Sequence, residues 1–128
     1  MRYATVIVLV AAALILAGCQ RIVPVHNVPV TQVYVPAEAD ASVIREAIVA
    51  GGRAKGWRMS HESPGHIVGY LALRDHTASV DIFYDAESYS IQYKDSSNLK
   101  YDGARIHRNY NKWIILLDQQ IQAKLPIR

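Results

Sequence analysis

The residues of this chain best suited to metal binding or acid–base chemistry are three histidines, at positions 61, 66 and 76. His61 and His66 flank the turn Ser63-Pro64-Gly65, and across a hairpin they could face each other as a zinc or copper pair. Two ligands are too few for a metal site, and no HExxH motif or set of cysteines supplements them. The sequence therefore favours solvated histidines, and we expect neither a metal ion nor another cofactor.

The third histidine belongs to a polar cluster, Arg74-Asp75-His76, with Asp81 and Asp85 nearby in the sequence. Such a cluster could contain a proton-transfer pair if a pocket excluded water. The simpler interpretation is a turn in which the Asp75 side chain hydrogen-bonds its own backbone. We therefore expect a structural role for this cluster.

Serine catalysis is not indicated either. Ser96 and Ser97 lack a GxSxG elbow, and nothing in the sequence marks a partner base for them. We expect that the protein is not an enzyme, and a small hydrolase that uses Asp81, His76 or Ser96 is the alternative.

A long polar connection, from Tyr93 to Gly103, contains the residues most suited to binding. Its candidate binding residues are Tyr93, Ser96, Asn98 and Tyr101. Tyrosine rings offer flat faces, while hydroxyl and amide groups offer hydrogen bonds, and this combination suits a peptide or a glycan. Surface loops on a rigid scaffold often carry function. The alternative is a strand-to-helix crossover with both tyrosines packed inward.

The basic residues are too few to indicate nucleic-acid binding. The formal net charge is +3. Arg105, Arg108 and Lys112 lie at helical spacing and could contact anionic lipid or peptidoglycan, although a solvated helix face is the simpler interpretation. We therefore expect no nucleic-acid partner.

The single cysteine, Cys19, lies at the end of an apolar N-terminal segment. Arg2 supplies a basic start, and Val6 to Leu16 is an apolar stretch of the length typical of an export signal. The tetrapeptide Leu16-Ala17-Gly18-Cys19 follows and resembles the lipobox of bacterial lipoproteins. The alternatives are an ordinary signal peptide and an uncleaved anchor.

The lipobox resemblance implies that residues 1–18 are a signal peptide and that Cys19 becomes the acylated N-terminus of the mature chain. Several acyl chains (a diacylglyceryl thioether and an N-linked chain such as palmitate) anchor a protein stably, whereas one chain does so only marginally. Position 20 is Gln rather than the Asp that commonly signals inner-membrane retention in such lipoproteins. We therefore expect an outer-membrane anchor with the domain facing the periplasm.

Motifs further along the chain are similar to those of a small uncharacterised proteobacterial lipoprotein family. The resemblance covers most of residues 43–121 and rests on Gly56-Trp57, Ser63-Pro64-Gly65-His66-Ile67, Arg74-Asp75-His76, Val80-Asp81-Ile82-Phe83-Tyr84, Tyr89-Ser90-Ile91-Gln92-Tyr93, Asp95-Ser96-Ser97-Asn98-Leu99-Lys100-Tyr101 and Tyr110-Asn111-Lys112-Trp113-Ile114. It implies localisation and domain organisation and supplies no mechanism.

The segment that follows Cys19 predicts a tether. Residues 19–38 contain three prolines among valines, which disfavours a helix. We expect an extended spacer of about 55 Å at full stretch. The alternative is a valine-rich strand that adds to the sheet edge of a partner. Its valines would be Val28, Val30, Val33 and Val35.

Residues 39–128 predict one globular domain of the α+β class. A first helix is expected from Asp40 or Ser42 to Lys55, weakened at Gly51-Gly52 and stopped by Gly56. A second is expected from Ile106 to Leu125, where apolar residues recur at helical spacing. Four strands are expected between them, at Trp57–Glu62, Ile67–Arg74, Ala78–Tyr84 and Tyr89–Lys94.

Alternation along these strands predicts one apolar face and one solvated face. The apolar set is Ile67, Leu71, Leu73, Val80, Ile82, Tyr84, Tyr89, Ile91 and Tyr93. The opposite set is Val68, Tyr70, Arg74, Ser79, Asp81, Ser90, Gln92 and Lys94. The sequence thus predicts an α-β-β-β-β-α order, with a four-stranded antiparallel meander and two helices packed on its apolar face.

These features predict a lipid-anchored, non-enzymatic module that binds an envelope protein or a cell-wall partner, or that serves envelope assembly. The 94–104 loop and the polar face of the sheet would make the contact. The alternatives are a periplasmic hydrolase near His76 and Asp81 and a purely structural envelope accessory protein.

Overall fold

The computed structural model describes residues 20–126, and both expected helices occur in it. Helix α2 spans Ser42–Ala54 and continues through the two glycines, and Gly56 follows it with a φ of 83°. The carboxylate of Asp40 accepts a hydrogen bond from the Ser42 backbone N–H at 2.8 Å, so it satisfies one free donor at the helix start. Helix α3 spans Arg108–Lys124 and begins later than expected, because Ile106 lies in a strand.

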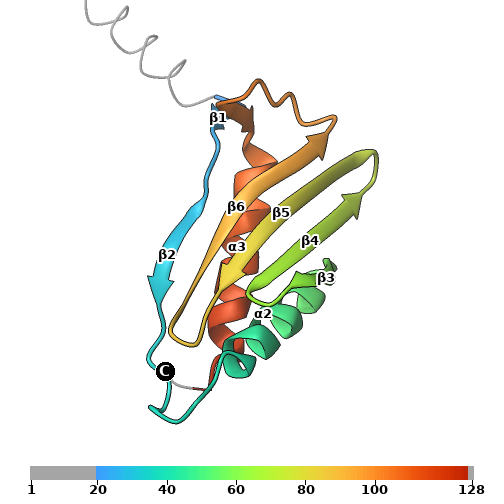
Figure 1. The fold of residues 1–128 in the computed structure, drawn as a ribbon. Coiled ribbons are helices and arrows are strands. Elements are labelled where there is room, and N and C mark those ends of the chain that lie inside the picture. The colour runs from blue at the N-terminus through green and yellow to red at the C-terminus, as the bar shows by residue number, and fades with distance from the viewer. Residues whose placement is uncertain (1–19, 127–128) are drawn as a thin grey trace, which may run out of the picture.

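The main sheet has five antiparallel strands rather than the four that we expected. Its strands are β2 (Val28–Gln32), β3 (Arg58–Ser63), β4 (His66–Leu73), β5 (His76–Tyr84) and β6 (Ser88–Ser97). They lie in the order β2-β6-β5-β4-β3, so the four expected strands form the meander and β2 adds at its edge beside β6 (Figure 1). A separate two-stranded sheet pairs β1 (Ile22–Pro24) with β7 (Arg105–His107).

The segment expected to be a free tether is therefore part of the fold. Strand β2 does add to a sheet edge, as the valine pattern suggested, but the edge belongs to the same chain. Val28 pairs with Ile91 and is buried, and a register irregularity follows before Thr31 pairs with Tyr89. Pro29 is tolerated because β2 is an edge strand, where a missing N–H breaks no second ladder.

Both helices pack on one face of the sheet, which makes a two-layer structure (Figure 1). The expected apolar face is buried beneath them, except that Tyr84 and Tyr93 are half-buried and Leu73 near the end of β4 is 46% exposed. On the opposite face most of the expected polar residues are accessible, but Ser90 is buried. Expected and observed faces therefore agree wherever the helices cover the sheet.

Helices α2 and α3 approach closely at Gly51. A Cβ atom on Gly51 would lie 2.6 Å from the backbone nitrogen of Ile121, so a side chain there would collide with main chain. At the adjacent Gly52, the three atoms nearest to an added Cβ all belong to the side chain of Met59, with Sδ at 2.3 Å. Gly51 and Gly52 lower the intrinsic stability of the helix, but they allow α2 to lie close to α3 and to the sheet.

Substitution of these glycines tests the contact. Gly51→Ala should lower the free energy of unfolding by about 1–2 kcal/mol, because overpacking against backbone outweighs the gain in helix propensity. Gly52→Ala is the matched control, since the flexible Met59 side chain can move, and its effect should stay within about 1 kcal/mol. Urea unfolding measures both, and equal effects of the two substitutions would contradict the close approach.

Candidate functional site

The four candidate binding residues line one cleft. Tyr93, Ser96, Asn98 and Tyr101 surround a cavity of about 330 Å³ between the end of β6 and the connection to β7. Lys94, Asp95, Leu99 and Lys100 complete its lining. We name this cavity the tyrosine cleft. It brings together residues that the sequence only suggested were near each other.

Strand β6 and the loop after it position these residues. The strand extends to Ser97, so the first part of the expected loop is strand, and its register with β5 shifts between Ser79 and Val80. After the strand, Asn98 and Lys100 adopt positive φ values of 61° and 57° on either side of the buried Leu99. This backbone anchors the loop in the core at its middle.

Asn98 is fixed by the β4–β5 turn. The Asn98 side-chain amide donates to Asp75 Oδ2 at 2.8 Å. The backbone carbonyl oxygen of Asn98 lies 2.8 Å from His76 Nδ1. We expected Asp75 to bond its own backbone, but it bonds Asn98 instead because the loop folds over the turn. It is Asp85 in the next turn that accepts from nearby backbone, led by Glu87 N–H, and these hydrogen bonds lower the pKa of Asp85.

The aromatic wall of the cleft is a stacked pair of tyrosines. The rings of Tyr93 and Tyr101 lie 4.0 Å apart between centroids at an interplanar angle of 29°. The Tyr93 hydroxyl lies 2.7 Å from Ser96 Oγ, and burial raises the pKa of Tyr93. Tyr101 remains 40% exposed, so the structure combines the two alternatives: Tyr93 packs inward and Tyr101 presents its ring to solvent.

A third tyrosine supports the pair from the core. Tyr110 of α3 is fully buried and meets Tyr93 edge-on, with centroids 5.5 Å apart and planes at 68°. Its hydroxyl has no hydrogen-bond partner among the described residues, and burial raises its pKa well above the usual range. The Tyr110 ring therefore packs behind Tyr93 in the core, and the Tyr110 hydroxyl is a buried polar atom without a hydrogen bond behind the cleft.

The strongest histidine–carboxylate pair lies elsewhere, on the open face of the sheet. His66 Nε2 lies 2.7 Å from Asp81 Oδ1, and Lys94 Nζ is 3.8 Å from the same oxygen. The His66 ring also stacks on Phe83 at 4.6 Å. The sequence contained the signal for this group: the turn at Arg74 fixes a register in which His66 faces Phe83 and Val68 faces Asp81.

The residues of the hydrolase alternative have different partners. His76 contacts Asn98 and Asp75, Asp81 contacts His66 and Lys94, and the Ser96 hydroxyl contacts Tyr93. Within residues 20–126, no hydrogen bond or ion pair joins any two of His76, Asp81 and Ser96.

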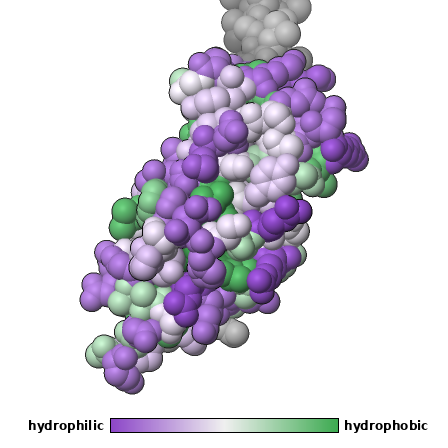
Figure 2. All heavy atoms as spheres, turned by 45° about the vertical axis from the view of Figure 1, so that its right-hand side comes forward, coloured by the Kyte–Doolittle hydropathy of each residue, from purple (hydrophilic) through white to green (hydrophobic). Residues whose placement is uncertain are grey.

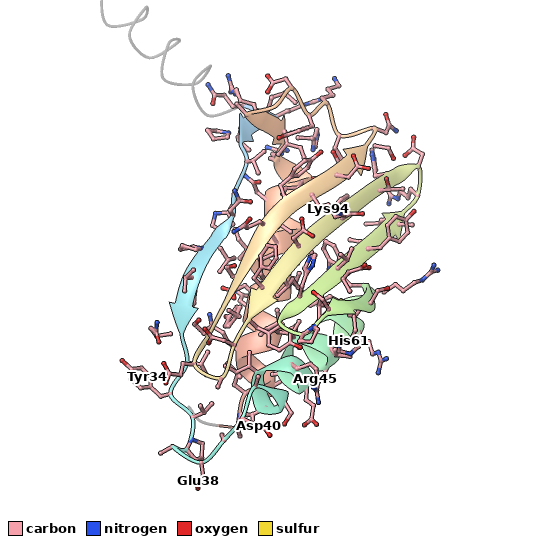
Figure 3. The ribbon with its side chains drawn as sticks, in the orientation of Figure 1. Tyr34, Glu38, Asp40, Arg45, His61 and Lys94 are labelled. Atoms are coloured by element: carbon pink, nitrogen blue, oxygen red, sulfur yellow. The ribbon has the colours of Figure 1, made fainter. Side chains whose placement is uncertain are left out.

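His61 and His66 do not face each other across the hairpin, which was the possibility that a metal pair required. His61 pairs with Ile67, whose side chain is in the core, so His66 next to Ile67 points to the opposite face of the hairpin. Figure 3 shows His61 beside Arg45 of α2, and the two residues line a common surface hollow. Among residues 20–126 no group of three or more His, Cys, Asp or Glu residues is placed to bind a metal ion.

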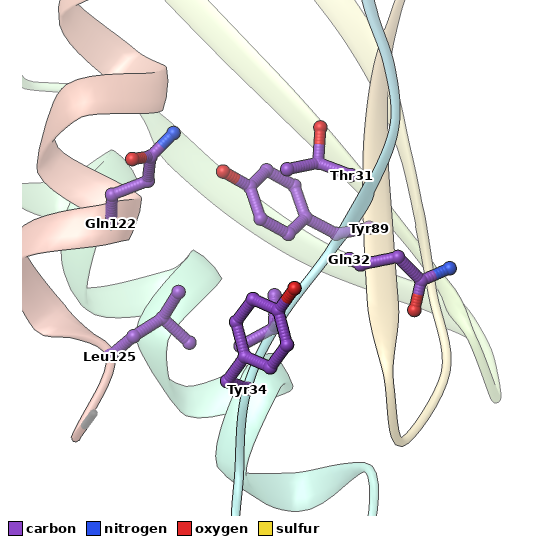
Figure 4. A pocket seen from close by; sticks show the side chains of 7 residues that line it. Thr31, Gln32, Tyr34, Tyr89, Gln122 and Leu125 are labelled. Atoms are coloured by element: carbon purple, nitrogen blue, oxygen red, sulfur yellow. The ribbon is translucent and has the colours of Figure 1, made fainter. Parts of the chain in front are cut away.

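A second groove, of about 500 Å³, lies between the edge strand β2 and the C-terminal end of α3 (Figure 4). Its central polar atom is the Tyr89 hydroxyl, which donates to Asp118 Oδ1 at 2.5 Å. Burial, followed by the effect of Asp118, raises the pKa of Tyr89. This hydroxyl is already engaged within the protein, as are the side chains of Tyr93, Ser96 and Asn98 in the tyrosine cleft, so free polar groups do not distinguish the two sites.

Comparisons of the chain with protein-family models, curated proteins and solved structures find no match. In the described part of the chain, neither helix is both long and apolar enough to cross a membrane.

The two buried tyrosines of α3 and β6 provide a matched test of this geometry. Tyr110→Phe removes an unsatisfied hydroxyl and should raise the free energy of unfolding by about 1 kcal/mol. Tyr89→Phe removes a hydrogen bond to a carboxylate and should lower it by about 1.5–3 kcal/mol. Denaturant unfolding measures both changes, and a comparable loss of stability in Tyr110→Phe would contradict the isolation of its hydroxyl.

Proposed function

We propose that the protein is an outer-membrane lipoprotein whose periplasmic domain binds an envelope partner through the tyrosine cleft and is not an enzyme. The observation that carries the proposal is the convergence of Tyr93, Ser96, Asn98 and Tyr101 on one cleft. An exposed ring, an amide and hydroxyl groups at the same cavity suit a peptide or glycan segment of a protein or cell-wall partner.

The geometry of the cleft supports binding more than bond cleavage. Asn98 and Tyr93 are oriented by hydrogen bonds to Asp75 and Ser96, so the cleft is preformed and a ligand would lose little in ordering it. A nucleophile would need a base within hydrogen-bond reach, and the hydroxyl of Ser96 instead meets the hydroxyl of Tyr93.

The anchor rests on the lipobox at Cys19, which lies outside the described residues. Acylation of this thiol would attach the domain to the membrane, and Gln20 favours the outer membrane over the inner one. The described domain begins immediately after this position, at Gln20.

Substitutions at positions 19 and 20 test the anchor. Cys19→Ala should abolish incorporation of labelled palmitate and remove the acylated N-terminal peptide from the mass spectrum. Gln20→Asp keeps the acylated cysteine and should move the protein from the outer-membrane to the inner-membrane fraction on a density gradient. Palmitate incorporation that persists in Cys19→Ala would contradict the anchor.

Substitutions in the cleft test the binding role. Tyr101→Ala and Asn98→Ala should each weaken the interaction with the partner at least tenfold, because they remove the exposed ring and the amide. Tyr34→Ala is the matched control, since Tyr34 is 83% exposed and lies at the far end of the molecule from Lys94 of the cleft (Figure 3).

The partner is captured by photo-crosslinking in cells from position 101 and from position 34, and purified peptidoglycan is tested separately by cosedimentation. A partner specific to position 101 supports the cleft. Equal capture from both positions, together with no binding to peptidoglycan, would favour a purely structural envelope protein.

A further inference from the structure

The structure places the start of the domain against its own C-terminal half. The Arg108 N–H donates to the Arg21 carbonyl oxygen at 2.7 Å, and the Val25 N–H donates to the Ala104 carbonyl oxygen at 3.0 Å. The side chain of Asn111 donates to the Pro24 carbonyl oxygen at 2.8 Å. The backbone is therefore fixed from Arg21 onward.

This short connection limits how far the domain can lie from an acylated Cys19. Arg21 is the second residue after Cys19, and an extended chain spans at most about 3.6 Å per residue. The β1–β7 end of the domain would thus lie within about 10 Å of the lipid headgroups, a distance comparable to the Debye length at physiological salt. Charges at this end would act on the membrane directly.

Four exposed basic residues lie on the segments that these contacts join at this end, and we name them the basic end: Arg21, Lys100, Arg105 and Arg108. Arg105 donates to the Ile22 carbonyl oxygen at 2.5 Å, and Lys100 follows Leu99, whose carbonyl oxygen accepts from His107 N–H at 2.9 Å. Figure 2 shows that hydrophilic residues cover this upper end of the molecule.

The acidic residues nearby cancel only part of this charge. Asp102 is the one carboxylate in the loop between Lys100 and Arg105; hydrogen bonds from the N–H groups of Ala104 and Arg105 lower its pKa, so it stays ionised and offsets one of the four positive charges. Asp75 in the adjacent turn is preceded by Arg74, so that turn adds no net charge.

The electrostatic effect is visible at His107. Burial first, and then the positive charges of Arg108, His76, Lys100 and Arg21, lower the pKa of this histidine. Charges from the residue before β1, the start of β5, the β6–β7 loop and the start of α3 therefore act on His107, although these segments are distant in the sequence.

We propose that the basic end binds anionic phospholipid headgroups and holds the domain directly on the membrane surface. The orientation rests on the proposed acylation of Cys19, whereas the affinity for anionic lipid rests on the four basic residues alone. Each basic residue close to an anionic surface strengthens binding by about fivefold, and salt weakens the effect.

The test uses the chain from Gln20 onward, because all the described strands, helices and core residues lie within residues 20–126. It is mixed with vesicles of phosphatidylcholine alone or with 30% phosphatidylglycerol, and binding is measured by cosedimentation at low and high salt. We expect binding to the anionic vesicles only, and loss of that binding at high salt.

Two double variants with the same change in net charge locate the surface. Lys100→Glu with Arg108→Glu should weaken binding to anionic vesicles at least tenfold. Arg45→Glu with Lys124→Glu should retain binding, because Lys124 is at the opposite end of the 17-residue helix α3, about 25 Å from Arg108. Circular dichroism confirms folding, and the conservative pair Lys100→Arg with Arg108→Lys should bind like the unchanged chain.

Equal losses in the two double variants would show an effect of net charge and would overturn the proposal, as would equal binding to neutral vesicles or no binding to either. The anchor is read separately, from the mass of the N-terminal peptide of the full chain isolated from cells. An unmodified Cys19 with intact vesicle binding would overturn the anchor and leave the lipid-binding surface standing.

Discussion

The pairing of β1 with β7 determines where the start of the domain lies relative to both proposed binding surfaces. The strands come from opposite ends of the domain, and the hydrogen bond from Arg105 to Ile22 joins residues 83 positions apart. Because β7 leads directly into α3, the pairing places the start of the domain at the start of this helix. Both the loop after β6 and the basic end depend on it.

The tyrosine cleft adjoins β7, because the His107 N–H of that strand donates to the Leu99 carbonyl oxygen at 2.9 Å. Leu99 is buried in the middle of the loop, and Tyr110 supports Tyr93 from α3. The loop is therefore fixed at its centre by apolar burial and at its start by the hydrogen bonds of Asn98. The cleft is therefore exposed to solvent, while the buried residues Leu99 and Tyr110 behind it keep its loop ordered.

Local patterns predicted the meander, the two helices and the apolar face, because alternation and helical spacing depend on neighbouring residues. The pairing of residues 22–32 could not be predicted in this way. Prolines at positions 24 and 29 are equally compatible with a tether and with edge strands, and only contacts with Ile91 and His107 decide between them.

The candidate site likewise has features that the sequence predicts and features that depend on distant contacts. Chemistry within one polar segment was enough to predict the residues of the cleft, Tyr93, Ser96, Asn98 and Tyr101. The hydrogen bond between Asn98 and Asp75 could not be predicted, because it forms only when the loop folds over a distant turn. The pairing of His66 with Asp81 was within reach of the sequence, since it follows from the register set by one tight turn.

The absence of a free spacer within residues 20–38 changes what the cleft can reach. Lys100 lines the tyrosine cleft and also belongs to the basic end, so the two surfaces adjoin. With Cys19 acylated as proposed, a ligand in the cleft would sit beside the lipid headgroups, instead of about 55 Å away on an extended tether. A partner bound in the cleft would then have to reach the inner surface of the outer membrane itself, where Lys100 would adjoin both the ligand and the lipid headgroups.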